Sequence, residues 1–252
     1  MSLTHRLAEC CLVPSPPGPW DVPWVASAPP RAGILPDGTY CLDPFAWPRV
    51  QVGGTCAGNA VAQAITTGLV LLGEPRVEVS GTGCWAQGQL WGAVEGADVD
   101  ADAGAWVAKV LEACRVWGWP LRTDHAEEGL ASLDASALGE IVARATGAFT
   151  IEHRIISESD CKDALHEQWQ IVASGPVDEA FAAAKPGGWV DTCTSGGGHA
   201  QLIDGYSPAG YLDRDTWGRG VGEIEFEKKR LHMSVGWMKS RWELRAVRVV
   251  RR

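Results

Sequence analysis

The chain has 252 residues, a formal net charge of −9, 46% hydrophobic residues and 21% charged residues. These proportions are typical of a soluble globular protein and exclude a disordered or fibrous chain. The length suits one large domain or two small ones, and no apolar run approaches the roughly 18–20 residues that cross a bilayer. The N-terminal segment has neither the apolar core nor the cleavage site of a secretory signal, so we expect synthesis in the cytoplasm.

The eight cysteines are more than average for this length. Without a secretory signal we expect reduced thiols, and the absence of any C-x-x-C pair argues against a zinc site. The acidic loop at 98–102 lacks the glycine and glutamate spacing of a calcium-binding loop. The sequence therefore predicts no metal, no cofactor, and neither nucleic acid nor a membrane as partner.

Charge and proline divide the chain into three regions. Residues 1–48 contain ten prolines and cannot form a regular helix, so we expect a Pro-rich N-terminal arm pinned to the body by its tryptophans. Residues 49–227 form the expected main domain, and residues 228–252 form a basic C-terminal strand or tail. Residues 223–252 carry nine Lys or Arg against four acids, which predicts a solvated strand or terminus, with contact to an anionic partner as the alternative.

The predicted elements change character along the main domain. Val61, Ile65 and Leu69 follow one another at four-residue steps, which predicts a helix that ends at the following glycine and proline. By the same reasoning we expect helices at 56–72, 83–93, 103–117, 136–145 and from 159 or 160 to 168. Alternating and glycine-bounded segments predict strands at 149–156, 170–174, 188–191, 199–205, 210–214, 223–227 and 245–250. Helices first and strands second indicate an α+β fold with two lobes that divide near residue 146.

The first segment with chemical character is VQVGGTCAGNA at 50–60. Its glycine-rich loop delivers Cys56 to a helix N-terminus, where unpaired N–H groups and the helix dipole stabilise a thiolate. A thiolate is the form of cysteine that acts as a nucleophile. The alternative is a small buried cysteine at a tight turn.

Two more segments lie downstream. In SGGGHAQLIDGY at 195–206, three glycines leave His199 approachable, and a rigid strand would hold the ring as a general base must be held. In RDTWGRGVG at 214–222, the carboxylate of Asp215 could orient an imidazole, and the indole of Trp217 could shield that hydrogen bond from water. The alternatives are a structural histidine and an ordinary turn with an anchoring tryptophan.

The order Cys, His, Asp and the motifs around them resemble the papain-like (C1-type) cysteine peptidases. In that family Q-G-x-C-G-x-C-W holds the nucleophile, G-H-A-V opens the histidine strand, and N-S-W-G carries the third member. The segments GGGHAQLIDGY and DTWGRGVG are similar to the second and third motifs, and the segment from Asp102 to Pro120 looks like the family's D-x-G helix. The resemblance covers about residues 40–225. It implies a helical lobe followed by an antiparallel β lobe, with the active-site cleft between them.

The resemblance also implies roles for five residues. Cys56 is the nucleophile, and His199 is the general base that later protonates the leaving amine. Asp215 stands where the family has asparagine, and its charge would raise the pKa of the histidine and strengthen a thiolate–imidazolium pair. Trp217 matches the shielding indole. Gln51 is the expected oxyanion donor, together with the N–H of Cys56.

The sequence departs from the family pattern at two positions. Gln51 lies five residues before Cys56, where the family usually has six, and no tryptophan follows the cysteine. The sequence GTCAG is more similar to divergent bacterial and phage members. We expect no inhibitory pro-segment of the usual size before Cys56, although the Pro-rich arm could gate the cleft.

The leading hypothesis is a cysteine peptidase that hydrolyses peptide or isopeptide bonds of a peptide or protein substrate through an acyl-enzyme on Cys56. A second hypothesis is a virion- or cell-wall-associated protein of a phage or bacterium that acts on peptidoglycan peptides and assembles with other virion or cell-envelope proteins. A third is a non-catalytic papain-like structural or binding module. We expect His125, His153 and His166 to lie at the surface, and the other seven cysteines to be inert thiols.

Overall fold

The computed structural model describes residues 12, 14–25, 38–46, 48–94, 104–123, 148–219, 221 and 229–252. The helices are α2 (Cys56–Leu71), α3 (Gly81–Val94), α4 (Val107–Trp117), η2 (Glu158–Asp160), α6 (Cys161–His166), α7 (Glu179–Ala183) and α8 (Val235–Lys239). The strands are β1 (Tyr40–Cys41), β2 (Phe149–Ile155), β3 (Gln170–Val177), β4 (Trp189–Val190), β5 (Gly197–Tyr206), β6 (Tyr211–Arg214), β7 (Leu231–Met233) and β8 (Glu243–Arg251).

The strands form one sheet in the order β2-β8-β3-β5-β6-β7-β4, with β1 paired to β5. Only β4 and β7 run parallel among these pairs, and the others are antiparallel. The α+β fold expected from the sequence, with helices followed by a largely antiparallel sheet, is therefore confirmed.

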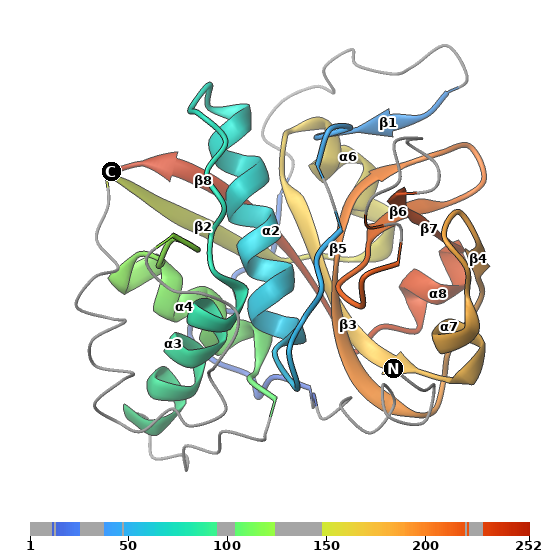
Figure 1. Ribbon diagram of the computed structural model, residues 1–252, viewed down its shortest axis with the longest axis horizontal. Helices are drawn as coiled ribbons and strands as arrows, with labels where there is room; N and C mark the ends of the chain where they lie inside the picture. The colour runs from blue at the N-terminus through green and yellow to red at the C-terminus, as the bar shows by residue number, and fades with distance from the viewer. Residues whose placement is uncertain are drawn as a thin grey trace.

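Helix α2 runs through the middle of the molecule, with α3 and α4 on one side and most of the strands on the other, while β2 and β8 extend behind it toward α4 (Figure 1). Nearly every residue of α2 is buried, because its alanines and glycines let neighbouring elements come close on all sides. One core cluster joins α2, α3 and α4 to the sheet face that carries Ala200 and Leu202. A second cluster fills the opposite face, around Phe181, Ile203 and Trp237.

The predicted elements agree with the structure where the sequence pattern is long. The helix expected at 56–72 is α2, and those expected at 83–93 and 103–117 are α3 and α4, although α4 begins only at Val107. The helix at 136–145 and the strand at 223–227 lie outside the described residues. The short helices α7 and α8 were not predicted, because five residues are too few to show a helical period.

The C-terminal segment differs from the expected solvated terminus. Strand β8 lies between β2 and β3, and most of its residues are buried. Its arginines are matched by acids, since Arg245 contacts Asp21 and Glu243, and Arg248 contacts Glu152. The basic residues of β8 therefore form ion pairs within the same chain, and the expectation of a solvated strand is wrong for this segment.

Residues 14–25, which we call the arm, lie along the end of β2. Pro23 forms a parallel bridge with Ile155, and the Trp24 N–H donates to the Ile155 carbonyl at 2.7 Å. Trp24 is buried, in agreement with the expected anchoring by tryptophan, whereas Trp47 lies outside the described residues. Within the described ranges, none of the helices combines the length and the apolar character needed to span a bilayer.

Candidate active site

Cys56 is the first residue of α2, as the sequence predicts. Gly53 has φ +56, a conformation that favours glycine, and the Thr55 hydroxyl donates to the Val52 carbonyl at 2.7 Å, so the loop turns sharply into the helix. The first turn contains no acidic residue, so no carboxylate offsets the positive end of the helix dipole.

Gln51 is brought to the site by a short antiparallel pairing. The Gln51 N–H donates to the Thr216 carbonyl at 2.7 Å, and Val50 bridges Trp217. One side-chain N–H of Gln51 donates to the Gly53 carbonyl at 2.9 Å. The side-chain amide has a second hydrogen, which remains available to donate to a ligand bound beside the loop before Cys56.

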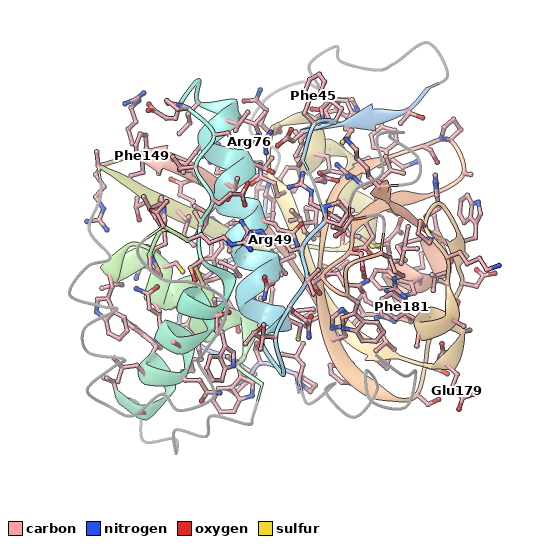
Figure 2. The ribbon with its side chains drawn as sticks, viewed as in Figure 1. Phe45, Arg49, Arg76, Phe149, Glu179 and Phe181 are labelled. Carbon is pink, nitrogen blue, oxygen red and sulfur yellow. The ribbon has the colours of Figure 1, made fainter. Side chains whose placement is uncertain are left out.

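The segment that carries Gln51 is also fixed from the other side. Figure 2 shows Arg49 beside α2. Its guanidinium donates to the Val79 carbonyl at 2.5 Å and pairs with Glu78 at 2.6 Å. A cavity of about 340 Å³ opens here, lined by Pro48, Arg49, Val50, Asn59, Glu78, Arg122 and Val221.

His199 lies on β5, opposite Gly175 of β3, and its side chain is fully buried. The ring centroid lies 4.7 Å from that of Trp217 and 5.7 Å from that of Phe181. Burial lowers the pKa of His199 well below its usual value, and the positive charges of Arg219 and Arg241 lower it further. The ring is therefore neutral near pH 7.

Thr216 provides the hydrogen-bond partner of this ring. Its hydroxyl donates to Gln51 Oε1 at 2.7 Å, and His199 Nε2 lies 3.4 Å from the same oxygen. Because the hydroxyl proton is used on Gln51, the histidine proton belongs on Nε2. The other ring nitrogen, Nδ1, is buried and makes no hydrogen bond in the described part of the chain. Nδ1 is therefore a free base.

Asp215 does not take the predicted place beside the imidazole. One carboxylate oxygen accepts from the Arg219 guanidinium at 2.7 Å, and the other accepts from the N–H groups of Trp217 and Arg219 at 2.9 Å each. None of its hydrogen bonds among the described residues reaches His199. The expectation that its charge raises the histidine pKa is also wrong, because burial and nearby arginines lower that pKa.

The sequence reasoning missed Thr216 because it carried the family's third position onto Asp215. A signal was present in the sequence: an arginine four residues after an aspartate in a tight turn is a natural ion-pair partner for it. A carboxylate used in this way is not available to an imidazole. The Trp217 indole, by contrast, lies over the histidine ring, where a shielding group is needed.

Other predicted positions have varied outcomes. His153 and His166 are buried rather than exposed, because Glu112 and the Tyr206 hydroxyl pair with their ring nitrogens, whereas His125 lies outside the described residues.

The six described cysteines are free thiols. Burial raises the pKa of Cys41 to about 12 and that of Cys193 to about 11, so both are protonated at neutral pH. Among the described residues, no three metal-ligating side chains gather into a metal site.

Several solved structures share the fold of this chain. Xylellain, a cysteine protease from Xylella fastidiosa, is 18% identical, with 95% of each chain covered and a TM-score of 0.71. Digestive procathepsin L 3 of Tenebrio molitor larval midgut is 16% identical, with 99% of this chain and 79% of that chain covered and a TM-score of 0.70. Bromelain from Ananas comosus, solved with the E64 inhibitor, is 15% identical, with 85% and 99% covered and a TM-score of 0.61.

The sequence itself matches no protein-family model and no curated protein. At these low identities the structural likeness defines the fold and leaves the activity open. The helices, the sheet and nearly the whole length of the chain are included in the likeness to xylellain. The chain therefore has the α+β fold of the papain-like cysteine proteases, as the resemblance in its motifs predicts.

Proposed function

We propose that this chain is a cysteine peptidase that cleaves peptide or isopeptide bonds through a covalent acyl-enzyme on Cys56. The observation that carries the proposal is that Nδ1 of His199 is free while Thr216 holds Nε2. The same domain places Cys56 at the start of its central helix. A buried base whose opposite nitrogen is fixed is the arrangement that general base catalysis requires.

The reaction follows from these groups. His199 Nδ1 takes the proton of the Cys56 thiol, and the thiolate attacks the substrate carbonyl carbon. The N–H of Cys56 and the second amide hydrogen of Gln51 stabilise the oxyanion. The C–N bond then breaks, His199 gives its proton to the leaving amine, and water hydrolyses the thioester to free the thiol.

Two features describe the state of the site before substrate enters. Cys56 and His199 are both buried, and the thiol is not hydrogen-bonded to Nδ1. The N–H of Leu12 donates to the Gly198 carbonyl at 3.3 Å, directly before His199. The proposed reaction therefore begins with a movement that opens the site to the substrate.

The experiment combines hydrolysis with active-site labelling. The full chain is incubated with an unfolded protein substrate, and separately with an epoxide-type thiol reagent whose site of attachment is read by mass spectrometry. Cys56→Ala should lower hydrolysis by about 10⁴-fold or more and abolish labelling. Cys41→Ala is the matched control, because its thiol has a raised pKa, and it should behave as the unmodified chain. Hydrolysis that survives in Cys56→Ala would exclude the proposed nucleophile.

Purified peptidoglycan forms a second arm of this experiment. Arg245 and Arg248 of the basic terminus pair with acids of the same chain, which removes part of the charge that would have favoured an anionic wall, so we propose peptide or protein substrates instead. Release of wall peptides without cleavage of the protein substrate would favour the cell-wall hypothesis. A folded chain that neither reacts with the reagent nor hydrolyses either substrate would support the non-catalytic module.

A further inference from the structure

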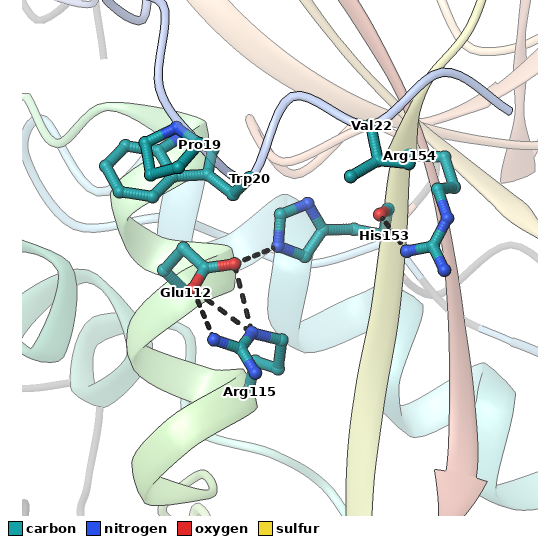
Figure 3. A pocket seen from close by; sticks show the side chains of 7 residues that line it. All are labelled: Pro19, Trp20, Val22, Glu112, Arg115, His153 and Arg154. Atoms are coloured by element: carbon teal, nitrogen blue, oxygen red, sulfur yellow. Dashed lines mark hydrogen bonds and ion pairs between the residues drawn. The ribbon is translucent and has the colours of Figure 1, made fainter.

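A cavity of about 320 Å³ lies between the arm, α4 and β2, away from the candidate active site. Figure 3 shows Pro19, Trp20 and Val22 of the arm on one side, with Glu112 and Arg115 from α4 and His153 and Arg154 from β2 on the other. The walls thus combine an apolar surface from the arm with basic groups from the body. A volume of this size suits a ligand as large as an amino-acid derivative.

The carboxylate of Glu112, which lines the cavity, already accepts hydrogen bonds from two neighbouring side chains. Glu112 accepts from His153 Nε2 at 2.6 Å and from Arg115 Nη2 at 2.8 Å and Nε at 3.1 Å. Burial raises the pKa of Glu112, but the hydrogen bonds from His153 and Arg115 outweigh it and lower the pKa to about 2. Glu112 is therefore ionised and can only accept, so the His153 proton on this side belongs to Nε2.

The second nitrogen of His153 has no such partner. The side chain is 3% exposed, and Nδ1 makes no hydrogen bond in the described part of the chain. Figure 3 shows this nitrogen turned away from Glu112, on the side of the arm. A buried polar atom without a partner costs free energy, and a ligand in the cavity would remove that cost.

The guanidinium of Arg154 is the second group available to a ligand. Among the described residues, its guanidinium makes one hydrogen bond, from Nη1 to the His153 carbonyl at 2.7 Å. The remaining N–H groups of this side chain can form a two-pronged hydrogen bond with a carboxylate. With Glu112 satisfied, the two arginines leave the cavity with an excess of positive charge.

We propose that this cavity binds a small monocarboxylate that carries an apolar group. The carboxylate lies between Arg154 and His153 Nδ1, and the apolar group packs against Trp20 and Val22. A free organic acid and the C-terminus of a peptide share this chemistry, and the experiment below separates them.

A hydrogen bond from Nδ1 to a carboxylate needs a proton on that nitrogen, because a lone pair there would repel the anion.

The test measures binding to the full chain without any substrate, so its outcome does not depend on peptidase activity. Phenylacetate and the peptide N-acetyl-Ala-Ala-Phe are titrated while the imidazole nitrogens of His153 are followed by ¹⁵N NMR. We expect saturable shifts with at least one probe. Binding of phenylacetate alone identifies a free acid as the ligand class, and binding of the peptide identifies a peptide C-terminus.

Amide probes and arginine variants complete the design. Phenylacetamide and the C-terminally amidated peptide have the same shape without charge, and should bind at least tenfold more weakly than the acids. Arg154→Gln should weaken acid binding at least tenfold. Arg248→Gln is the matched control, because Arg248 pairs with Glu152 outside the cavity, and it should leave binding unchanged. Equal binding of amide and acid, no effect of Arg154→Gln in a folded chain, or no saturable shift would each overturn the proposal.

Discussion

His199 is held by a hydroxyl group rather than by a carboxylate or an amide. Thr216 Oγ1 lies 3.4 Å from Nε2, which is long for a hydrogen bond, so the packing of Trp217 and Phe181 must supply much of the orientation. The same hydroxyl donates to Gln51 at 2.7 Å. One side chain therefore links the proposed general base to the proposed oxyanion donor.

Replacement of this hydroxyl provides the first prediction. Thr216→Val keeps the shape of the side chain but leaves Gln51 Oε1 and His199 Nε2 without their shared partner. We expect kcat/KM for a peptide substrate to fall by about 10–100-fold and stability to fall by about 1–3 kcal/mol. Thr216→Ser restores the hydroxyl and should recover most of the activity. Equal loss in both variants would mean that the threonine methyl group, rather than the hydroxyl, matters.

Asp213 gives a prediction on pH at the same scale. Its side chain is fully buried, and its only hydrogen bond among the described residues comes from Gln201 at 3.1 Å. Burial raises the pKa of Asp213 well above its usual value, and the negative charge of Asp215 raises it further. A raised pKa in the folded state means that stability is present below the unfolded pKa, near 4, and is lost as pH rises through the folded value.

Asp213→Asn removes this titration. The free energy of unfolding of the variant, relative to that of the unmodified chain, should therefore rise as the pH increases above about 4. Thermal or urea unfolding at several pH values measures it. A difference that stays constant over this range would contradict a buried, protonated Asp213.

At the scale of elements, the close approach of α2 and α3 holds the start of α2 in place. A Cβ atom built on Gly58 would lie 2.1 Å from the Gly81 carbonyl oxygen and 2.5 Å from the Trp85 nitrogen. Both are backbone atoms, so neither can move aside without shifting α3. The helix that carries Cys56 is therefore positioned by a glycine in its first turn.

Gly58→Ala should accordingly destabilise the chain by about 3 kcal/mol, measured by chemical unfolding. The matched control is Gly73→Asn, where φ is +80 and no other atom lies within 4 Å of the added Cβ. Asparagine tolerates that conformation, so the control should stay within about 0.5 kcal/mol of the unmodified chain. A Gly58→Ala chain of ordinary stability would show that α3 shifts easily.

The elements also show what a sequence can reveal. The start of α2 was predictable because a glycine-rich loop and a run of small residues mark it, and strand β5 was predictable from the apolar run after His199. The role of Thr216 was only partly predictable. The spacing of Asp215 and Arg219 favours an ion pair between them, but the hydrogen bond from Thr216 to Gln51 joins residues 165 positions apart in the sequence. The burial of His153 likewise depends on Glu112, which is 41 residues away in the sequence.

At the scale of the whole molecule, the sheet joins segments from both ends of the chain. The C-terminal strand β8 pairs with β2 and β3, and Arg245 of β8 contacts Asp21 of the arm. The arm then continues toward the candidate active site, where the Leu12 backbone bonds Gly198. A hypothetical Cβ on Gly198 would lie 1.8 Å from the Leu12 carbonyl oxygen, so glycine is required for this contact.

We predict that Leu12 limits access to Cys56. It is 3% exposed and belongs to the same core cluster as Cys56 and Ala200. Leu12→Asp would bury a carboxylate in that cluster, which is costly enough to favour release of the segment. We expect the rate of Cys56 alkylation by a small thiol reagent to rise about tenfold or more.

The matched control adds the same charge two residues away. Pro14 is exposed, so Pro14→Asp should leave the alkylation rate unchanged. The arm should remain attached through Asp21 and Trp24 in both variants, which the solvent exposure of Trp24 can report by fluorescence quenching. An unchanged alkylation rate in a folded Leu12→Asp chain would mean that another part of the molecule covers Cys56. A faster rate would mean that the chain carries, in its own N-terminal segment, the cover of its proposed nucleophile.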